Sequence, residues 1–118
     1  MRADIQIVIN EIEKSLSLLR QRLDWDNVKK KREEFDALTE DPDLWNEPDK
    51  AQKLMRERQN FIDQVDGHDT ISNELKDNIE LLKLAEIEAD DEILLEVVAA
   101  LQKLKKRASS MELEALLN

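Results

Sequence analysis

The fold is decided by residues 54–89, which read LMRERQN FIDQVDG HDTISNE LKDNIEL LKLAEIE A when they are divided into sevens. The first position of each seven holds, in order, Leu54, Phe61, His68, Leu75, Leu82 and Ala89. A row that recurs every seven residues is typical of one face of an α-helix. Its phase is the same before and after Gly67, so we predict one continuous helix over about residues 47–89. Such a helix would span about 60 Å. Gly67 within it costs about 1 kcal/mol relative to alanine and is expected to mark a local bend.

Two similar rows flank this segment, and both alternate steps of three and four residues. They predict helices over about residues 3–22 and 91–117. The rows consist of Ile5, Ile9, Ile12, Leu16, Leu19 and Leu23, and of Leu94, Val97, Leu101, Leu104, Ala108, Met111 and Ala115. A shorter helix is predicted over about residues 25–40, because Pro42 disfavours a helical residue before it. Its apolar side holds Val28, Phe35 and Leu38.

Polar residues between these rows predict how the helices begin. Asp24 or Asp26 is expected to cap the helix over residues 25–40 by accepting hydrogen bonds from backbone N–H groups. Residues 41–48 are expected to form an ordered loop. Asn46 is expected to cap the long helix, with Pro48 in the first turn, where its missing N–H costs nothing.

The break between the last two helices reads Ala89-Asp90-Asp91-Glu92. Asp90 is expected to cap the final helix, and the next two carboxylates favour its positive N-terminal end. So short a break forces the two helices to fold back antiparallel. The predicted fold is therefore all-α, an elongated antiparallel bundle of about four helices built on a long helical hairpin.

The composition excludes several classes of protein. The chain has 118 residues, which is one domain, 1–118, and it ends at Leu116-Leu117-Asn118 without a C-cap glycine, as expected of a piece cut from a longer protein. It has 28 acidic and 18 basic residues, a net charge of −10, no cysteine, one histidine and one glycine. Cysteine nucleophiles, histidine metal sites and Gly-rich phosphate loops are excluded, and a free-standing nucleic-acid binder is disfavoured.

Membrane and secreted proteins are disfavoured as well. No uncharged run is longer than that of residues 5–10, which is far too short to span a membrane, and the N-terminus lacks the features of a signal peptide. A bundle of this size can bury one seam but not an enclosed pocket for a small-molecule substrate. We expect a cytoplasmic, non-enzymatic protein with no catalytic residue, no cofactor and no metal.

Several groups of residues could still carry a function. His68 is interpreted as a core residue because it lies in the heptad row. The basic runs 29–32 and 103–107 are interpreted as solvated helix faces paired with acids, although either could touch a phosphate backbone. Trp25 and Trp45 are expected to anchor loops against the bundle; a tryptophan that proves exposed would instead be a contact for a partner.

The strongest candidate is an acidic set around the predicted hairpin turn. It is expected to serve mainly capping and solubility, and a weaker hypothesis is that it docks on a basic protein surface. The residues of that possible contact are Asp90, Asp91 and Glu92; the rest of the set is Glu86, Glu88 and Glu96.

Several stretches of the chain resemble one protein family. They are Leu23-Asp24-Trp25-Asp26, Glu40-Asp41-Pro42-Asp43-Leu44-Trp45-Asn46-Glu47-Pro48, Ala51-Gln52-Lys53-Leu54 and Glu86-Ile87-Glu88-Ala89-Asp90-Asp91-Glu92. Together they resemble the N-terminal helical domain of bacterial peptide chain release factor 2, a class I release factor, over essentially the whole chain. The pattern of Trp45 with the two prolines separates this family from release factor 1.

The resemblance implies a ribosome-docking domain of a factor that directs translation termination at UGA and UAA codons. It implies two partners: the ribosome, at the stalk base of the large subunit and its ribosomal protein, and the class II release-factor GTPase. The family's catalytic Gly-Gly-Gln and codon-reading Ser-Pro-Phe tripeptides do not occur in this sequence. No catalytic or decoding residue is therefore assigned, and the expected role is positional.

A second hypothesis remains open, and a third is disfavoured. The chain could be a free-standing coiled-coil adaptor or dimerising scaffold whose apolar seams a second chain completes, whereas an intramolecular bundle should be monomeric. A carboxylate metal protein on a helical bundle would need Glu-x-x-His pairs, but Val65 stands three positions before the single histidine.

Overall fold

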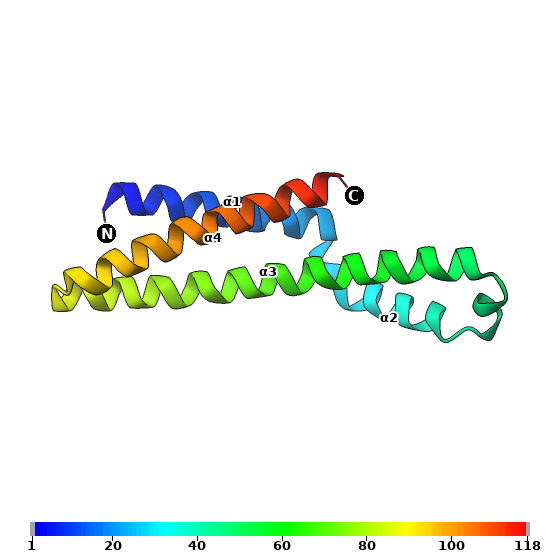
Figure 1. Cartoon of the computed structure of the whole chain (residues 1–118). Helices are drawn as coiled ribbons and strands as arrows, with labels where there is room; N and C mark the ends of the chain where they lie inside the picture. The colour runs from blue at the N-terminus through cyan, green and yellow to red at the C-terminus, as the bar shows by residue number, and fades with distance from the viewer. Residues whose placement is uncertain (1, 118) are drawn as a thin grey trace.

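An elongated bundle of four α-helices makes up residues 2–117, the part of the chain that the computed structural model describes (Figure 1). The helices are α1 (Ala3–Leu23), α2 (Val28–Thr39), α3 (Pro48–Glu88) and α4 (Asp91–Leu117), with short 3-10 helices η1 (Trp25–Asn27) before α2 and η2 (Pro42–Asn46) after it. The described residues contain no strand and measure 63 × 23 × 23 Å, which confirms the predicted fold class. Met1 and Asn118, the ends of the predicted domain, lie outside the described residues.

α3 is one unbroken helix of 41 residues, as the heptad row predicts. Gly67 lies within it and has a packing reason to be a glycine. A Cβ at this position would lie 2.1 Å from Cε and 2.8 Å from Sδ of Met111 on α4. Because glycine has no Cβ, the end of the Met111 side chain can occupy this space.

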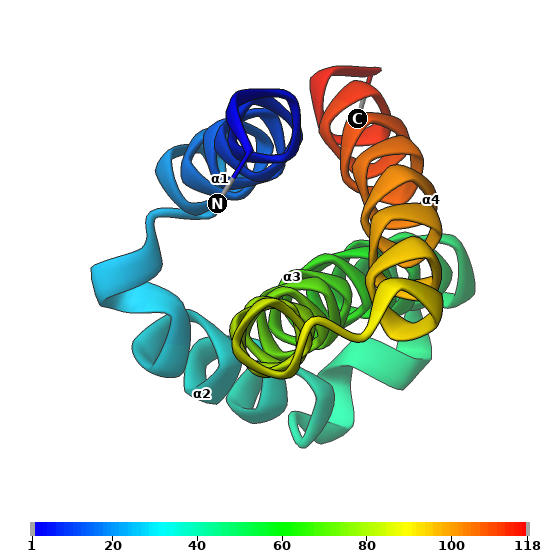
Figure 2. The ribbon, with the colours of Figure 1, turned by 90° about the vertical axis from the view of Figure 1, so that its left-hand side faces the viewer.

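A single apolar core fills one half of the bundle. Figure 2 looks along this half and shows α1, α4 and the C-terminal half of α3 at the corners of a triangle. The predicted rows point inward, and removing each of these large side chains from water stabilises the fold by about 1.5–3 kcal/mol. The most deeply buried are Ile9, Ile12, Leu19, Ile71, Leu82, Val97, Leu101 and Leu104. The apolar seams of the three helices thus cover one another within one chain.

Polar contacts tie α4 to its two neighbours at the edge of this core. Ser15 Oγ on α1 donates to Glu112 Oε1 on α4 at 2.8 Å. Lys105 Nζ lies 2.7 Å from Glu11 Oε2 on α1, and Arg107 pairs with Glu74 on α3. Two members of the basic run 103–107 are therefore paired with acids, as interpreted from the sequence.

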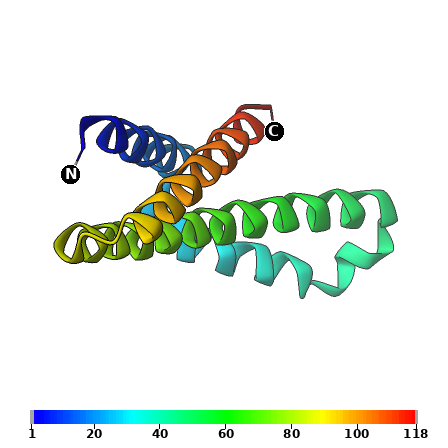
Figure 3. The same ribbon diagram turned by 60° about the vertical axis from the view of Figure 1, so that its left-hand side comes forward.

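The other half of the molecule is a two-helix arm, formed by α2, η2 and residues 48–66 of α3. It extends beyond the three-helix half in Figures 1 and 3. α2 has no fully buried residue. Its half-buried Phe35 packs against Phe61 of α3 with ring centroids 5.6 Å apart. A small apolar cluster, Leu23, Phe61 and Val65, joins the arm to α1.

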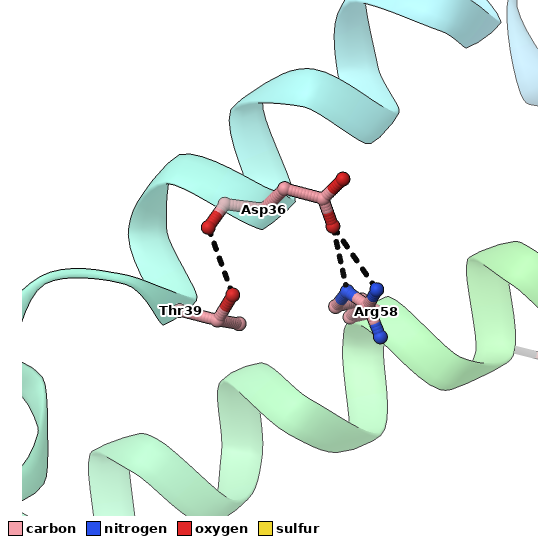
Figure 4. Close-up of polar contacts among 3 residues, drawn as sticks. All are labelled: Asp36, Thr39 and Arg58. Carbon is pink, nitrogen blue, oxygen red and sulfur yellow. Dashed lines mark hydrogen bonds and ion pairs between the residues drawn. The ribbon is translucent and has the colours of Figure 1, made fainter.

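One charged contact holds the two helices of the arm together. Nε and Nη2 of Arg58 on α3 donate to Oδ1 of Asp36 on α2 at 3.1 and 3.0 Å (Figure 4). The hydroxyl of Thr39 donates to the backbone oxygen of Asp36 at 2.8 Å, at the C-terminal end of α2. Both partners of the ion pair are partly shielded from water, which favours it over a fully exposed pair.

Several predicted helix starts are wrong. α2 begins at Val28 and not at residue 25, because Trp25–Asn27 form the 3-10 helix η1. Asp24 does not cap a helix with its side chain: it ends α1 in the left-handed conformation, with φ 54°, and its carboxylate accepts from Asn27 Nδ2. The residue before α2 is Asn27, so Asp26 does not cap it either.

The segment between α2 and α3 also differs from its prediction. Residues 41–48, predicted as an ordered loop, contain the 3-10 helix η2, which Asp41 caps by accepting from the N–H of Asp43 at 3.0 Å. Glu47, not Asn46, occupies the N-cap position of α3, and its side chain makes no capping bond. Pro48 lies in the first turn, as predicted.

Candidate functional site

The turn between α3 and α4 forms one end of the molecule, and we call it the hairpin tip (residues 84–96). Ala89 ends α3 in the left-handed conformation with φ 53°. The N–H of Asp90 donates to Ala85 O at 2.9 Å, and that of Ala89 donates to Glu86 O at 3.3 Å. These two bonds satisfy carbonyls at the helix end and reverse the chain within two residues.

Asp90 caps α4, as the sequence predicts. Its Oδ1 accepts from the N–H of Ile93 at 3.1 Å, and its backbone oxygen accepts from the N–H of Leu94 at 3.0 Å. Asp91 and Glu92 lie exposed in the first turn of α4. Of the three candidate contact residues, Asp90 is thus engaged within the turn, and the other two present their carboxylates to solvent.

Exposed apolar side chains accompany these acids, and the sequence interpretation missed them. Ile87 is 81% exposed, Leu95 is 70% exposed, and Leu84 is also exposed. The signal was available, because Leu84 and Ile87 lie off the heptad row of Leu82 and Ala89 and have no place in the seam. Large apolar groups that the core does not need, placed among charges, are typical of protein contact surfaces.

The part of the hairpin that includes the tip also concentrates the charge of the chain. Residues 65–99, which form the C-terminal half of α3 and the start of α4, carry 11 acidic and two basic side chains. Their net charge of −9 accounts for nearly all of the −10 of the whole sequence. The rest of the chain is close to neutral, so one end of the molecule is strongly acidic.

His68 is a buried core residue, as interpreted from the sequence. Its Nε2 lies 3.0 Å from Nη1 of Arg20 on α1, and its Nδ1 lies 3.1 Å from Oδ1 of Asp69. A guanidinium can only donate, so Nε2 accepts from Arg20 and Nδ1 carries a proton that it donates to Asp69. The Nε2 bond joins α1 to α3, and the Nδ1 bond, which lies within α3, fixes the orientation of the ring, so the role of His68 is structural.

The two tryptophans differ in their surroundings. Trp25 packs on the imidazole of His68 with ring centroids 4.1 Å apart and is half-buried, so its predicted anchoring role is confirmed. Trp45 is 57% exposed in η2, so the preferred interpretation that it anchors a loop is wrong. Its exposure makes it a possible contact for a partner.

The basic run 29–32 lies on the solvent side of α2, but the predicted pairing with acids is not found there. Lys31 places its ammonium 5.2 Å from the centroid of the Phe61 ring. Among the described residues, no ion pair joins this run to Glu33 or Glu34. The run is therefore a solvated face with one cation–π contact.

The described part of the chain, residues 2–117, holds neither a cluster of metal ligands nor a candidate membrane span. No three His, Cys, Asp or Glu side chains in that range gather where they could hold a metal ion. Over the same residues, no helix combines the length and apolar character that crossing a membrane requires.

Comparison with known proteins places these features in context. Residues 28–118 match the family model described as the PCRF domain. The whole chain aligns with proteins named peptide chain release factor 2: it is 51% identical to that of Roseobacter denitrificans, 47% to that of a Ruegeria species and 39% to that of Paramagnetospirillum magneticum. The chain covers 32% of each of these relatives, so it spans about a third of their length.

Proposed function

This chain belongs to the PCRF domain family, and we propose from that premise that it is the N-terminal, ribosome-docking domain of a translation termination factor. In this proposal it acts in the cytoplasm as part of a factor that directs release at UGA and UAA codons. The domain itself is positional and non-catalytic. Decoding and hydrolysis belong to parts of the factor that this sequence does not contain.

The acidic, apolar hairpin tip supports this function more than any other feature. Asp91 and Glu92 lie exposed beside Ile87 and Leu95, at the end of a bundle that is 63 Å long. Such a surface suits a basic protein with apolar contacts, because opposite potentials speed association and buried apolar side chains supply affinity. It suits RNA poorly, because phosphates are bound by clustered cations.

The tip favours a basic ribosomal protein as partner, and the resemblance to release factor 2 implies the one at the stalk base of the large subunit. The bundle would hold the factor there at a fixed distance, and α3 makes such a spacer stiff because it runs unbroken. The class II release-factor GTPase is proposed as the second partner. No residue is assigned to that contact.

Charge reversal at the tip tests the docking surface. The double variant Asp91→Lys/Glu92→Lys should weaken binding of the fluorescently labelled chain to purified large ribosomal subunits about tenfold, measured by anisotropy at fixed salt. Ile87→Asp should weaken it by a similar factor, because it places a charge in the apolar contact. Both variants leave the Asp90 cap intact.

The matched control is Glu33→Lys/Glu34→Lys, which makes the same charge change at exposed positions on α2. It should bind large subunits within about twofold of the parent chain if the tip, and not net charge, decides affinity. Equal weakening by both double variants, or no saturable binding by the parent, would contradict the docking proposal.

The chain alone should also release no peptide from a termination complex with UGA in the decoding site.

A further inference from the structure

The two-helix arm has an open side. Two hollows of about 390 and 520 Å³ lie along it, and Glu57 lines both. On α2 the lining residues are four and three positions apart, and on α3 they recur every three residues with two adjacent pairs, so each set lies on one side of its helix. They are Lys31, Phe35 and Leu38 on α2, and Lys50, Lys53, Leu54, Glu57, Asn60, Phe61 and Gln64 on α3. The two hollows meet at Glu57, and together we call them the α2–α3 groove.

The floor of the groove is apolar. Leu44 and Phe61 are buried there, Phe35 and Leu54 are half-buried, and Leu38 is 51% exposed. Two packed helices leave part of their apolar faces uncovered. In the other half of the molecule a third helix covers the corresponding faces, but the arm consists of α2 and α3 alone. The ion pair of Asp36 with Arg58 does not line either hollow, so it leaves the groove open.

The charges at the two ends of the groove differ in sign. The η2 end is lined by three carboxylates, those of Asp41, Asp43 and Glu47. Two lysines also line this end, Lys50 and Lys53, and Lys50 is already paired with Glu47 at 3.7 Å. Arg22 and Lys31 lie at the end beside α1 and α4. A helix with acids in its first turn and basic residues in its last could bind with its N-terminus at the basic end of the groove, so that both turns meet opposite charges. Its own dipole also favours acids in the first turn and basic residues in the last.

We propose that the α2–α3 groove binds one amphipathic helix of a partner protein. From Lys50 to Gln64 the groove follows α3 for about 21 Å, which matches a helix of about 14 residues, or four turns. The partner helix has an apolar stripe, acids in its first turn and basic residues in its last. A second copy of this chain is a poor occupant, because two molecules of charge −10 repel each other.

This surface lies at the opposite end of the molecule from the hairpin tip (Figure 1), so it does not depend on the proposed function. RNA does not fit it, because carboxylates and apolar side chains form most of the lining. Trp45 follows Leu44 directly in η2 and is exposed at the same end, where it can extend the apolar contact.

A designed peptide tests the proposal. The probe is a fluorescein-labelled, side-chain-stapled helix of about 14 residues with leucines at i, i+3, i+4 and i+7, glutamates in the first turn and lysines in the last. It should bind the chain saturably, and the largest amide chemical-shift changes should fall on α2, η2 and residues 50–64. A probe with the glutamates and lysines exchanged should bind about tenfold more weakly.

Leu38→Asp is the decisive variant, because its side chain is half-exposed and its loss spares the core. It should weaken probe binding at least about tenfold. The control Leu113→Asp alters a similarly exposed leucine on α4 that lines neither hollow, and this variant should bind the probe within about twofold of the parent. Absence of saturable binding, or equal binding by both variants, overturns the proposal. A dimer in sedimentation that Leu38→Asp removes overturns it too, and assigns the groove to self-association.

Discussion

Gly67 shows how a single residue can matter to a fold for a reason its own helix does not reveal. Replacing it with alanine gains about 1 kcal/mol of helix propensity but places a Cβ against Cε and Sδ of Met111. In the Met111→Ala background those atoms are gone, so Gly67→Ala should stabilise that variant by about 1 kcal/mol. In the parent chain the gain should be smaller or reversed. A double-mutant cycle from urea unfolding should give a coupling of at least about 0.5 kcal/mol.

Identical effects of Gly67→Ala in the two backgrounds would mean that Met111 moves aside without cost.

The heptad row predicted that Gly67 lies inside a helix, because that prediction needs only local spacing. The row did not predict the need for glycine, since the obstructing side chain comes from another helix. The tautomer of His68 was equally hidden, because it depends on Arg20 of α1.

At the scale of elements, the end of α3 carries a strain that substitution can relieve. Ala89 adopts φ 53°, a conformation that costs a side-chain-bearing residue about 1–2 kcal/mol. Ala89→Gly should therefore raise the free energy of unfolding by about 1 kcal/mol. The matched control is Ala99→Gly, at an exposed position inside α4, which should lower it by about 1 kcal/mol. Thermal or urea unfolding measures both, and a loss of stability at Ala89 would contradict the expected relief.

The helices themselves were largely predictable, because an apolar row alone specifies where a buried face begins and ends. The caps were predicted only in part. Asp90 was correctly identified since it directly precedes a row across a very short break, whereas Asp24 ends α1 instead of starting α2. The apolar part of the tip was not predicted, because the heptad row identifies only the side chains of the buried seam. Ile87 lies off that row.

At the scale of the whole molecule, the buried seams predict the state of association. The rows of α1, α3 and α4 cover one another in one core, so the chain should be a monomer of 13.8 kDa in sedimentation at any concentration up to the micromolar range. Small-angle scattering should give a radius of gyration close to the 18.7 Å of the Cα atoms. A compact domain of this length would have about 13–14 Å. A doubled mass that persists on dilution would instead favour the dimerising scaffold.

The unbroken path of α3 has a mechanical consequence. This helix runs from the arm to the tip without a joint, so the two ends of the molecule turn together as a lever does. A tilt of one degree about one end displaces the other by about 1 Å over a helix of this length. A partner that binds the tip therefore sets the angle of the arm, and a force on the arm is transmitted to the tip.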